Sequence, residues 1–194
     1  MLMVRRLQKT MAQQAVTLKS KTAFTGFAAL SLARLSLGFI FLWAFFDKLF
    51  GLGFATCRDA VSNTVEMGCS QAWVQGGSPT EGFLSHATQG PFASWFQGLA
   101  GQGWVDWLFM LGLLGIGFTL FFGIMLRVGA IAGSVMLFLM WLSLLWPANN
   151  PFVDEHIVYI FVLLTIAAFA RYQRLGFARW WQKCSVVRKA PWLV

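Results

Sequence analysis

Charged residues are scarce in this sequence. They make up 11% of its 194 residues, whereas hydrophobic residues make up 58%, including ten tryptophans and twenty phenylalanines. A soluble domain of this length has too small an interior to bury that much apolar surface. The composition therefore excludes the soluble globular classes and predicts an integral membrane protein. Its apolar runs are continuous and do not alternate with polar residues, which favours membrane-spanning helices over a β-barrel.

Histidine and cysteine are scarce as well. The chain has two histidines, His86 and His156, and three cysteines. A haem held by two histidines would require both at matched depth on facing elements, which is possible only if the segment around His86 folds into the bundle. No Cys-x-x-Cys pair, phosphate-binding glycine loop or nucleophile elbow is present. The sequence thus lacks a complete catalytic constellation, and no metal site is predicted.

Four apolar runs are long enough to cross a bilayer, which takes about 20 helical residues. We expect an all-α membrane protein with a single domain over residues 1–194. It is a four-transmembrane-helix bundle with a long outer segment of short interfacial helices, residues 51–103. Residues 1–21 are expected to form a short amphipathic or frayed tail. The predicted spans are about 26–50, 104–126, 128–146 and 152–171.

Basic residues gather on one side of this topology, as the positive-inside bias requires, so both termini are expected to be cytoplasmic. The net charge of +8 then indicates contact with anionic membrane lipids and argues against a nucleic-acid partner. Arg34, within the first span, is expected to reach the inner surface by snorkelling. The basic residues that set the orientation are Arg5, Arg6, Lys9, Lys19, Lys21, Arg127, Arg171, Arg174, Arg179, Lys183, Arg188 and Lys189.

The stretch from Asn149 to Tyr159 contains an unusual share of the polar residues. Asn150 is predicted to cap the last helix and Pro151 to occupy its first turn. On a helical wheel Asp154 then points away from the face that carries His156. One interpretation is a solvated helix cap at the membrane surface, and the other is a proton or ligand site at the mouth of the bundle. The wheel groups Phe152, His156, Tyr159 and Leu163 on one face.

The four-span topology places several polar residues at the same outer depth. Asp47, Lys48, Asp106, Asp154 and His156 are therefore predicted to converge there. A quinone fits between aromatic side chains when a protonatable group holds its carbonyl, and His156 with Tyr159 could do so. The candidate catalytic residues are His156, Asp154, Asp106 and Asp47, and the candidate quinone-binding residues are Lys48, Tyr159 and Trp104.

The outer segment contains a predicted disulfide and a predicted capping box. Cys57 and Cys69 lie on the oxidising side with turn-forming residues between them, so we expect them to pair and Cys184 to stay free. In the chain-entropy model such a loop gains roughly 3 kcal/mol from cross-linking. Ser78 and Glu81 fit a capping box around Pro79.

Three elements of the sequence share their pattern with a known family. They are Arg34-Leu35-x2-Gly38-x3-Leu42-x4-Asp47-Lys48-Leu49-Phe50-Gly51, Trp73-x2-Gly76-Gly77-Ser78-Pro79-Thr80-x-Gly82-Phe83-Leu84 and Asn150-Pro151-Phe152-x-Asp154-x-His156. They resemble the DoxX/DoxD-like bacterial membrane proteins over about residues 30–170. The resemblance implies a multi-pass four-helix bundle in the bacterial plasma membrane. It also implies a role as the large subunit of a thiosulfate:quinone oxidoreductase. The insert between Cys57 and Cys69 departs from the family pattern, in which the first helix passes quickly to the Trp73 region.

Two classes of function remain open at this point. The first is a quinone-linked oxidoreductase subunit that oxidises a small sulfur anion at the outer face, with a redox partner subunit. The second is a non-catalytic membrane scaffold that docks a redox enzyme or stabilises an assembly. A solute transporter is a more distant third, because four helices would have to form a homo-oligomer to enclose a path.

Overall fold

The computed structural model describes residues 2–59, 61–148, 150–173 and 175–194, with side chains from Ala23 onward. Within these ranges every regular element is a helix, and one isolated antiparallel bridge joins Arg58 to Val65. The all-α class is therefore confirmed. The predictions for Asn149 and Arg174, and those for the side chains of the basic residues before Ala23, lie outside the described part of the chain.

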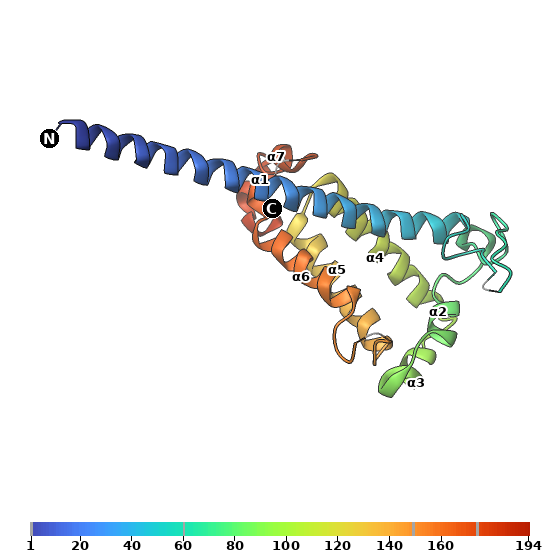
Figure 1. The fold of residues 1–194 in the computed structure, drawn as a ribbon. Coiled ribbons are helices and arrows are strands. Elements are labelled where there is room, and N and C mark those ends of the chain that lie inside the picture. Colours follow the sequence, from blue (N-terminus) through green and yellow to red (C-terminus); the bar gives the residue numbers. More distant parts are fainter. Residues whose placement is uncertain (1, 60, 149, 174) are drawn as a thin grey trace.

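Four long helices form the body of the molecule (Figure 1). They are α1 (Leu2–Phe50), α4 (Gly103–Phe122), α5 (Leu126–Ser143) and α6 (Glu155–Ala168). The short helices between α1 and α4 are η1 (Trp73–Gln75), α2 (Glu81–His86), η2 (Gly90–Phe92) and α3 (Ala93–Gln97). Those after α6 are η3 (Ala170–Tyr172), α7 (Ala178–Trp181), α8 (Ser185–Lys189) and η4 (Pro191–Leu193).

Three stretches are long and apolar enough to cross a membrane: Ala23–Phe50, Gly103–Phe122 and Leu126–Ser143. They agree with the first three predicted spans to within a few residues. The fourth apolar helix, α6, has 14 residues and is shorter than predicted. Large apolar side chains such as Phe39, Leu111, Phe138 and Phe161 are exposed along these helices, as expected of surfaces that face lipid.

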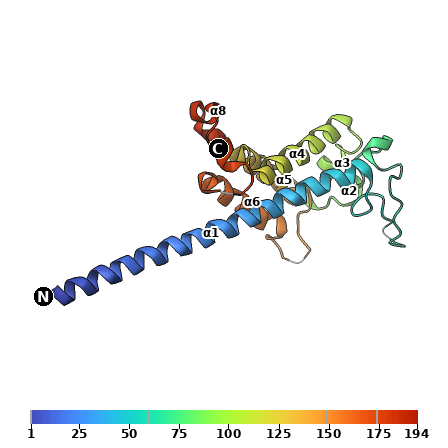
Figure 2. The ribbon, with the colours of Figure 1, turned by 90° about the horizontal axis from the view of Figure 1, so that it is seen from above.

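The first helix is longer than predicted. Residues 2–21 were expected to form a separate or frayed tail, but they continue α1 as one uninterrupted helix of 49 residues. Figures 1 and 2 show its N-terminal part projecting away from the other helices. At the opposite end α1 stops at Phe50, the predicted end of the first span, and Gly51 follows with a positive φ of 67°.

Close approaches show that successive long helices run antiparallel. A Cβ at Gly38 would lie 2.6 Å from the backbone nitrogen of Phe121, so α1 and α4 touch through backbone. Gly117 of α4 packs against Leu42 of α1. Gly129 of α5 faces Thr119 across the α4–α5 contact. The core between the helices consists of Leu37, Phe41, Met110, Leu113, Ile116, Leu120, Leu137, Leu163 and Ile166.

The turn between α4 and α5 consists of residues 123–125, and Arg127 lies inside the first turn of α5. The Arg127 backbone N–H donates to the Val194 carbonyl at 3.1 Å, and its guanidinium donates to the carbonyls of Ala167 and Pro191, both at 3.4 Å. Arg127 therefore binds the C-terminal segment to the end of the bundle at which α4 meets α5.

Arg34 is completely buried, with 0% of its surface exposed. Snorkelling to the inner surface is therefore the wrong description of this side chain. One guanidinium nitrogen donates to the Leu120 carbonyl at 2.6 Å and the other to the Leu175 carbonyl at 2.9 Å. The Leu120 carbonyl belongs to the C-terminal end of α4, where the helix dipole is negative and favours a cation. Arg34 thus connects α1, α4 and the segment that follows η3.

The outer segment begins with a cross-linked hairpin. Cys57 and Cys69 form a disulfide with their Cα atoms 5.7 Å apart, and Cys184 is free, as predicted. Asp59 closes the tip of the hairpin by accepting hydrogen bonds from the backbone and hydroxyl of Ser62 and from the backbone of Val61. These bonds lower the pKa of the Asp59 carboxyl, the Ser62 backbone contributing most, so the turn contains an ionised side chain.

Candidate functional site

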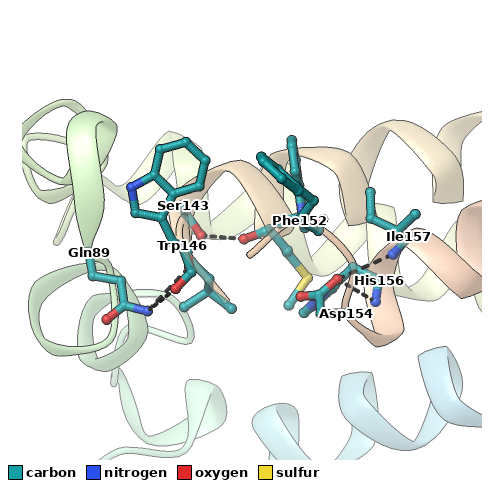
Figure 3. Close-up of polar contacts among 10 residues, drawn as sticks. Gln89, Ser143, Trp146, Phe152, Asp154, His156 and Ile157 are labelled. Carbon is teal, nitrogen blue, oxygen red and sulfur yellow. Dashed lines mark hydrogen bonds and ion pairs between the residues drawn. The ribbon is translucent and has the colours of Figure 1, made fainter. Parts of the chain in front are cut away.

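The first polar group at the outer end of the bundle is the pair formed by Asp154 and His156 (Figure 3). Asp154 has an extended backbone and is the N-cap of α6. Its Oδ1 accepts from the backbone N–H groups of His156 at 3.0 Å and Ile157 at 3.3 Å. Its Oδ2 lies 2.7 Å from His156 Nδ1. One carboxylate therefore both starts the helix and orients the imidazole.

This geometry corrects two sequence predictions. Asn150 does not cap α6; its Oδ1 accepts from the backbone of Phe152 and Val153 at 3.0 and 3.1 Å and forms a separate turn before the helix. Asp154 does not point away from His156. The helical wheel gave the wrong direction because Asp154 precedes the helix, where a period of 3.6 residues does not apply.

The chemistry available at His156 follows from its partner. Because an ionised carboxylate only accepts hydrogen bonds, a neutral His156 carries its proton on Nδ1 and presents a lone pair at Nε2. No hydrogen-bond partner for Nε2 is found in the described ranges. The residue is 8% exposed, so the imidazole lies largely out of water. A buried, oriented imidazole with one free nitrogen can accept a proton from a ligand hydroxyl or, once protonated, donate to a ligand carbonyl.

Contacts from the outer segment hold the connection between α5 and α6 beside this pair. The Gln89 side-chain amide donates to the carbonyls of Leu144 and Trp146, both at 3.2 Å. The Gln89 backbone N–H donates to the Ser143 carbonyl at 3.0 Å. Figure 3 shows Gln89 reaching this connection from the outer segment. On the other side, Trp141 Nε1 donates to the Phe152 carbonyl at 3.0 Å.

Asp47 lies in the last turn of α1 and is 1% exposed. Its carboxylate accepts three backbone N–H groups: Phe54 at 3.0 Å, Ala55 at 2.8 Å and Thr56 at 3.0 Å. These bonds fold the chain back immediately after the helix ends. The visible role of Asp47 is therefore to position the start of the outer segment.

Asp106, in the first turn of α4, is 6% exposed. Its Oδ1 accepts from the Ser78 hydroxyl at 2.8 Å, the Thr80 hydroxyl at 2.6 Å and the Thr80 backbone at 3.1 Å. The Ser78 hydroxyl also accepts from the Glu81 backbone at 3.1 Å. This is the backbone bond expected of the capping box, but α2 begins only at Glu81 with Thr80 as its N-cap, so Ser78 is not the helix cap that was predicted. The sequence identified Ser78 and Asp106 separately, but only the fold shows that they are bonded to each other.

The remaining candidates are dispersed around the outer end. The Lys48 ammonium lies over the ring of Phe109, 5.9 Å from its centroid. Tyr159 is half-buried one turn beyond His156, and Trp104 is exposed at the start of α4. His86 is exposed in the last turn of α2.

The outer end therefore contains several separate polar networks. Asp47, Asp106 and Asp154 each lie at this end of an antiparallel helix, but no hydrogen bond found among the described residues joins one to another. Asp154 and His156 are the two predicted site residues that the structure brings into direct contact. No group of three or more histidine, cysteine or acidic side chains in the described ranges could hold a metal ion.

Comparisons of this chain with protein-family models, with curated proteins and with solved structures found no match. The function is therefore argued from the residues and their geometry.

Proposed function

We propose that this chain is the membrane subunit of a quinone-linked oxidoreductase and that His156 transfers protons to and from the quinone. The observation that carries the proposal is the 2.7 Å contact between Asp154 Oδ2 and His156 Nδ1. That contact leaves Nε2 of a largely buried imidazole for a quinone oxygen. Tyr159 supplies an aromatic ring and a hydroxyl one turn away on the same helix.

The reaction requires two electrons and two protons for each quinone reduced. Residues 47–106 and 147–156 contain all seven acidic residues of the chain, with Lys48 and Arg58 as their only basic residues. This excess of negative charge repels a free thiosulfate dianion. We therefore assign oxidation of the sulfur donor, two thiosulfates releasing two electrons as they join, to a partner subunit. The described chain binds the neutral quinone and supplies protons through His156.

The proposal includes a fourth membrane crossing made by α6 and η3. The helix α6 alone is about 21 Å long at 1.5 Å per residue, short of the roughly 30 Å hydrocarbon core. It nevertheless packs antiparallel along α5, with Gly133 against Leu163 and Arg127 bonded to Ala167. Four crossings also put the basic residues before Ala23 and after Ala168 on one side, which three crossings would not.

The topology gives a direct prediction. Reporter fusions at Val194 and within residues 61–68 should report opposite sides of the membrane, with Val194 in the cytoplasm. An engineered cysteine at each position, tested for reaction with an impermeant thiol reagent, also reports the side of the membrane on which that position lies. A periplasmic Val194 would show that α6 does not cross.

The function itself is tested with protein purified in lipid nanodiscs. The chain should bind quinone and, together with its partner subunit, reduce it when thiosulfate or another sulfur donor from a panel is added. Absence of quinone binding by the folded protein would contradict the proposal.

A scaffold role is the second candidate, and a specific observation favours it. The carboxylates of Asp47 and Asp106 are both engaged by the backbone or hydroxyls of the outer segment. They therefore shape a surface that could dock a redox enzyme without taking part in its reaction. A folded chain that binds a partner but no quinone would support this alternative.

A further inference from the structure

We propose that the pocket between η1, α2 and the first turns of α4 binds an organic ammonium group. The pocket has a volume of about 470 Å³ and is lined by Trp73, Ser78, Glu81, Asp106 and Trp107 together with four glycines. His156 is not part of its lining. The inference therefore stands apart from the quinone proposal and can fail or succeed independently.

Two tryptophans give the pocket its aromatic walls. The rings of Trp73 and Trp107 meet edge to face, with centroids 4.7 Å apart and planes at 73°. Trp107 remains 59% exposed despite this contact. Both tryptophans line the pocket, and the π electrons of an exposed indole attract a cation, tryptophan being the strongest of the aromatic side chains in this respect.

The charged groups in the lining are both acidic. Asp106 is 6% exposed, and its Oδ1 is used by Ser78 and Thr80. No partner for Asp106 Oδ2 or for the exposed Glu81 carboxylate is found in the described part of the chain. The Oδ2 of Asp106 and the Glu81 carboxylate are therefore both free to attract a bound cation.

Lys48 is a candidate counter-ion for these carboxylates but does not pair with them. Lys48 lies over Phe109, one turn beyond Asp106 on α4, and forms no ion pair within the described ranges. Among the described residues, no lysine, arginine or histidine lines the pocket. The side chains of the lining therefore contribute only negative charge, which disfavours anions such as thiosulfate.

The pocket is held open by local structure. The bonds from Ser78 and Thr80 to Asp106 fix the segment before α2 against α4. Gly76 has a φ of 90° and Gly101 a φ of 71°, and a Cβ at either would meet nothing within 4 Å. The rim is thus free of side chains at these two positions, and the indole faces stay accessible to a methylated ammonium group.

The test uses choline and its uncharged carbon isostere, dimethylbutanol, with the full chain in phosphatidylglycerol nanodiscs. Equilibrium dialysis should show saturable choline binding and much weaker binding of the isostere. Trp107→Leu should weaken choline binding about threefold to tenfold. Glu81→Gln should weaken it about twofold to fivefold, because that carboxylate is exposed.

Matched controls are available on the same side of the molecule. Trp95 is also 59% exposed and meets Phe96 edge to face at 4.7 Å, but it does not line the pocket. Trp95→Leu, and Glu66→Gln at an exposed outer carboxylate, should leave choline binding unchanged. Equal binding of the isostere, equal losses in the control variants, or no saturable choline binding would overturn the proposal.

The same ammonium chemistry occurs in free amines and in lipid headgroups. Repeating the titration in phosphatidylethanolamine nanodiscs separates them. A lower apparent affinity for choline there would identify the headgroup as the occupant, and an unchanged affinity would identify a free ammonium compound. Both results support an ammonium site, provided that the variants behave as stated in phosphatidylglycerol.

Discussion

Replacing His156 by alanine should lower the rate of quinone reduction by about 10²–10⁴-fold, the range typical of losing a general acid–base group. The loss follows from the free Nε2, which is the proposed proton carrier. Asp154→Asn should have a smaller effect. Asparagine can still cap α6, but its amide can present either an acceptor or a donor to Nδ1 and no longer fixes the imidazole tautomer. Steady-state assays with the assembled enzyme measure both changes.

The other histidine provides the control for this prediction. His86 is exposed at the end of α2 and lies outside the proposed quinone site. His86→Ala should retain the wild-type rate, and all three variants should keep their helical circular dichroism. Wild-type turnover in a folded His156→Ala protein would remove this residue from the mechanism.

Replacing Arg34 by alanine should destabilise the bundle by about 3–5 kcal/mol. The Leu120 carbonyl, in a buried hydrogen bond, and the Leu175 carbonyl, in a partly buried one, would lose their donor. Each unsatisfied buried group costs about 1–3 kcal/mol, and the cavity left by the side chain adds to this. Arg34→Lys should cost less, because an ammonium can still donate to one of the carbonyls. Unfolding of the purified protein, followed by tryptophan fluorescence, ranks the variants.

Arg179 is the matched control, since it is an exposed arginine of α7 at the same end of the molecule. Arg179→Ala should change the stability by no more than about 0.5 kcal/mol. If Arg34→Ala and Arg179→Ala have the same free energy of unfolding, the two hydrogen bonds from Arg34 to carbonyls contribute nothing to the stability of the fold.

The long helices could be predicted because a helix that crosses a lipid bilayer requires a long, nearly continuous run of apolar residues. Long apolar runs located α4, α5 and the apolar part of α1, Ala23–Phe50, to within a few residues. The N-terminal extension of α1 was missed because its polar residues carry no hydropathy signal. The end of α6 was overestimated because its apolar run continues beyond the helix into η3.

The polar contacts were less predictable because they depend on where each backbone turns. Asp154 reaches His156 because the helix begins one residue later, at Glu155. Asp106 reaches Ser78 and Thr80 across more than twenty residues of chain. The burial of Arg34 depends on the Leu175 carbonyl, which no local pattern places beside it. The sequence thus identified the polar residues of the outer end but not their partners.

The quinone site itself is most directly tested by photoaffinity labelling. The chain in nanodiscs is irradiated with an azidoquinone, and the labelled peptides are mapped by mass spectrometry. The proposal predicts labelling within the first two turns of α6, around His156 and Tyr159, that excess unlabelled quinone suppresses. Labelling confined to other helices, or unaffected by competing quinone, would contradict it.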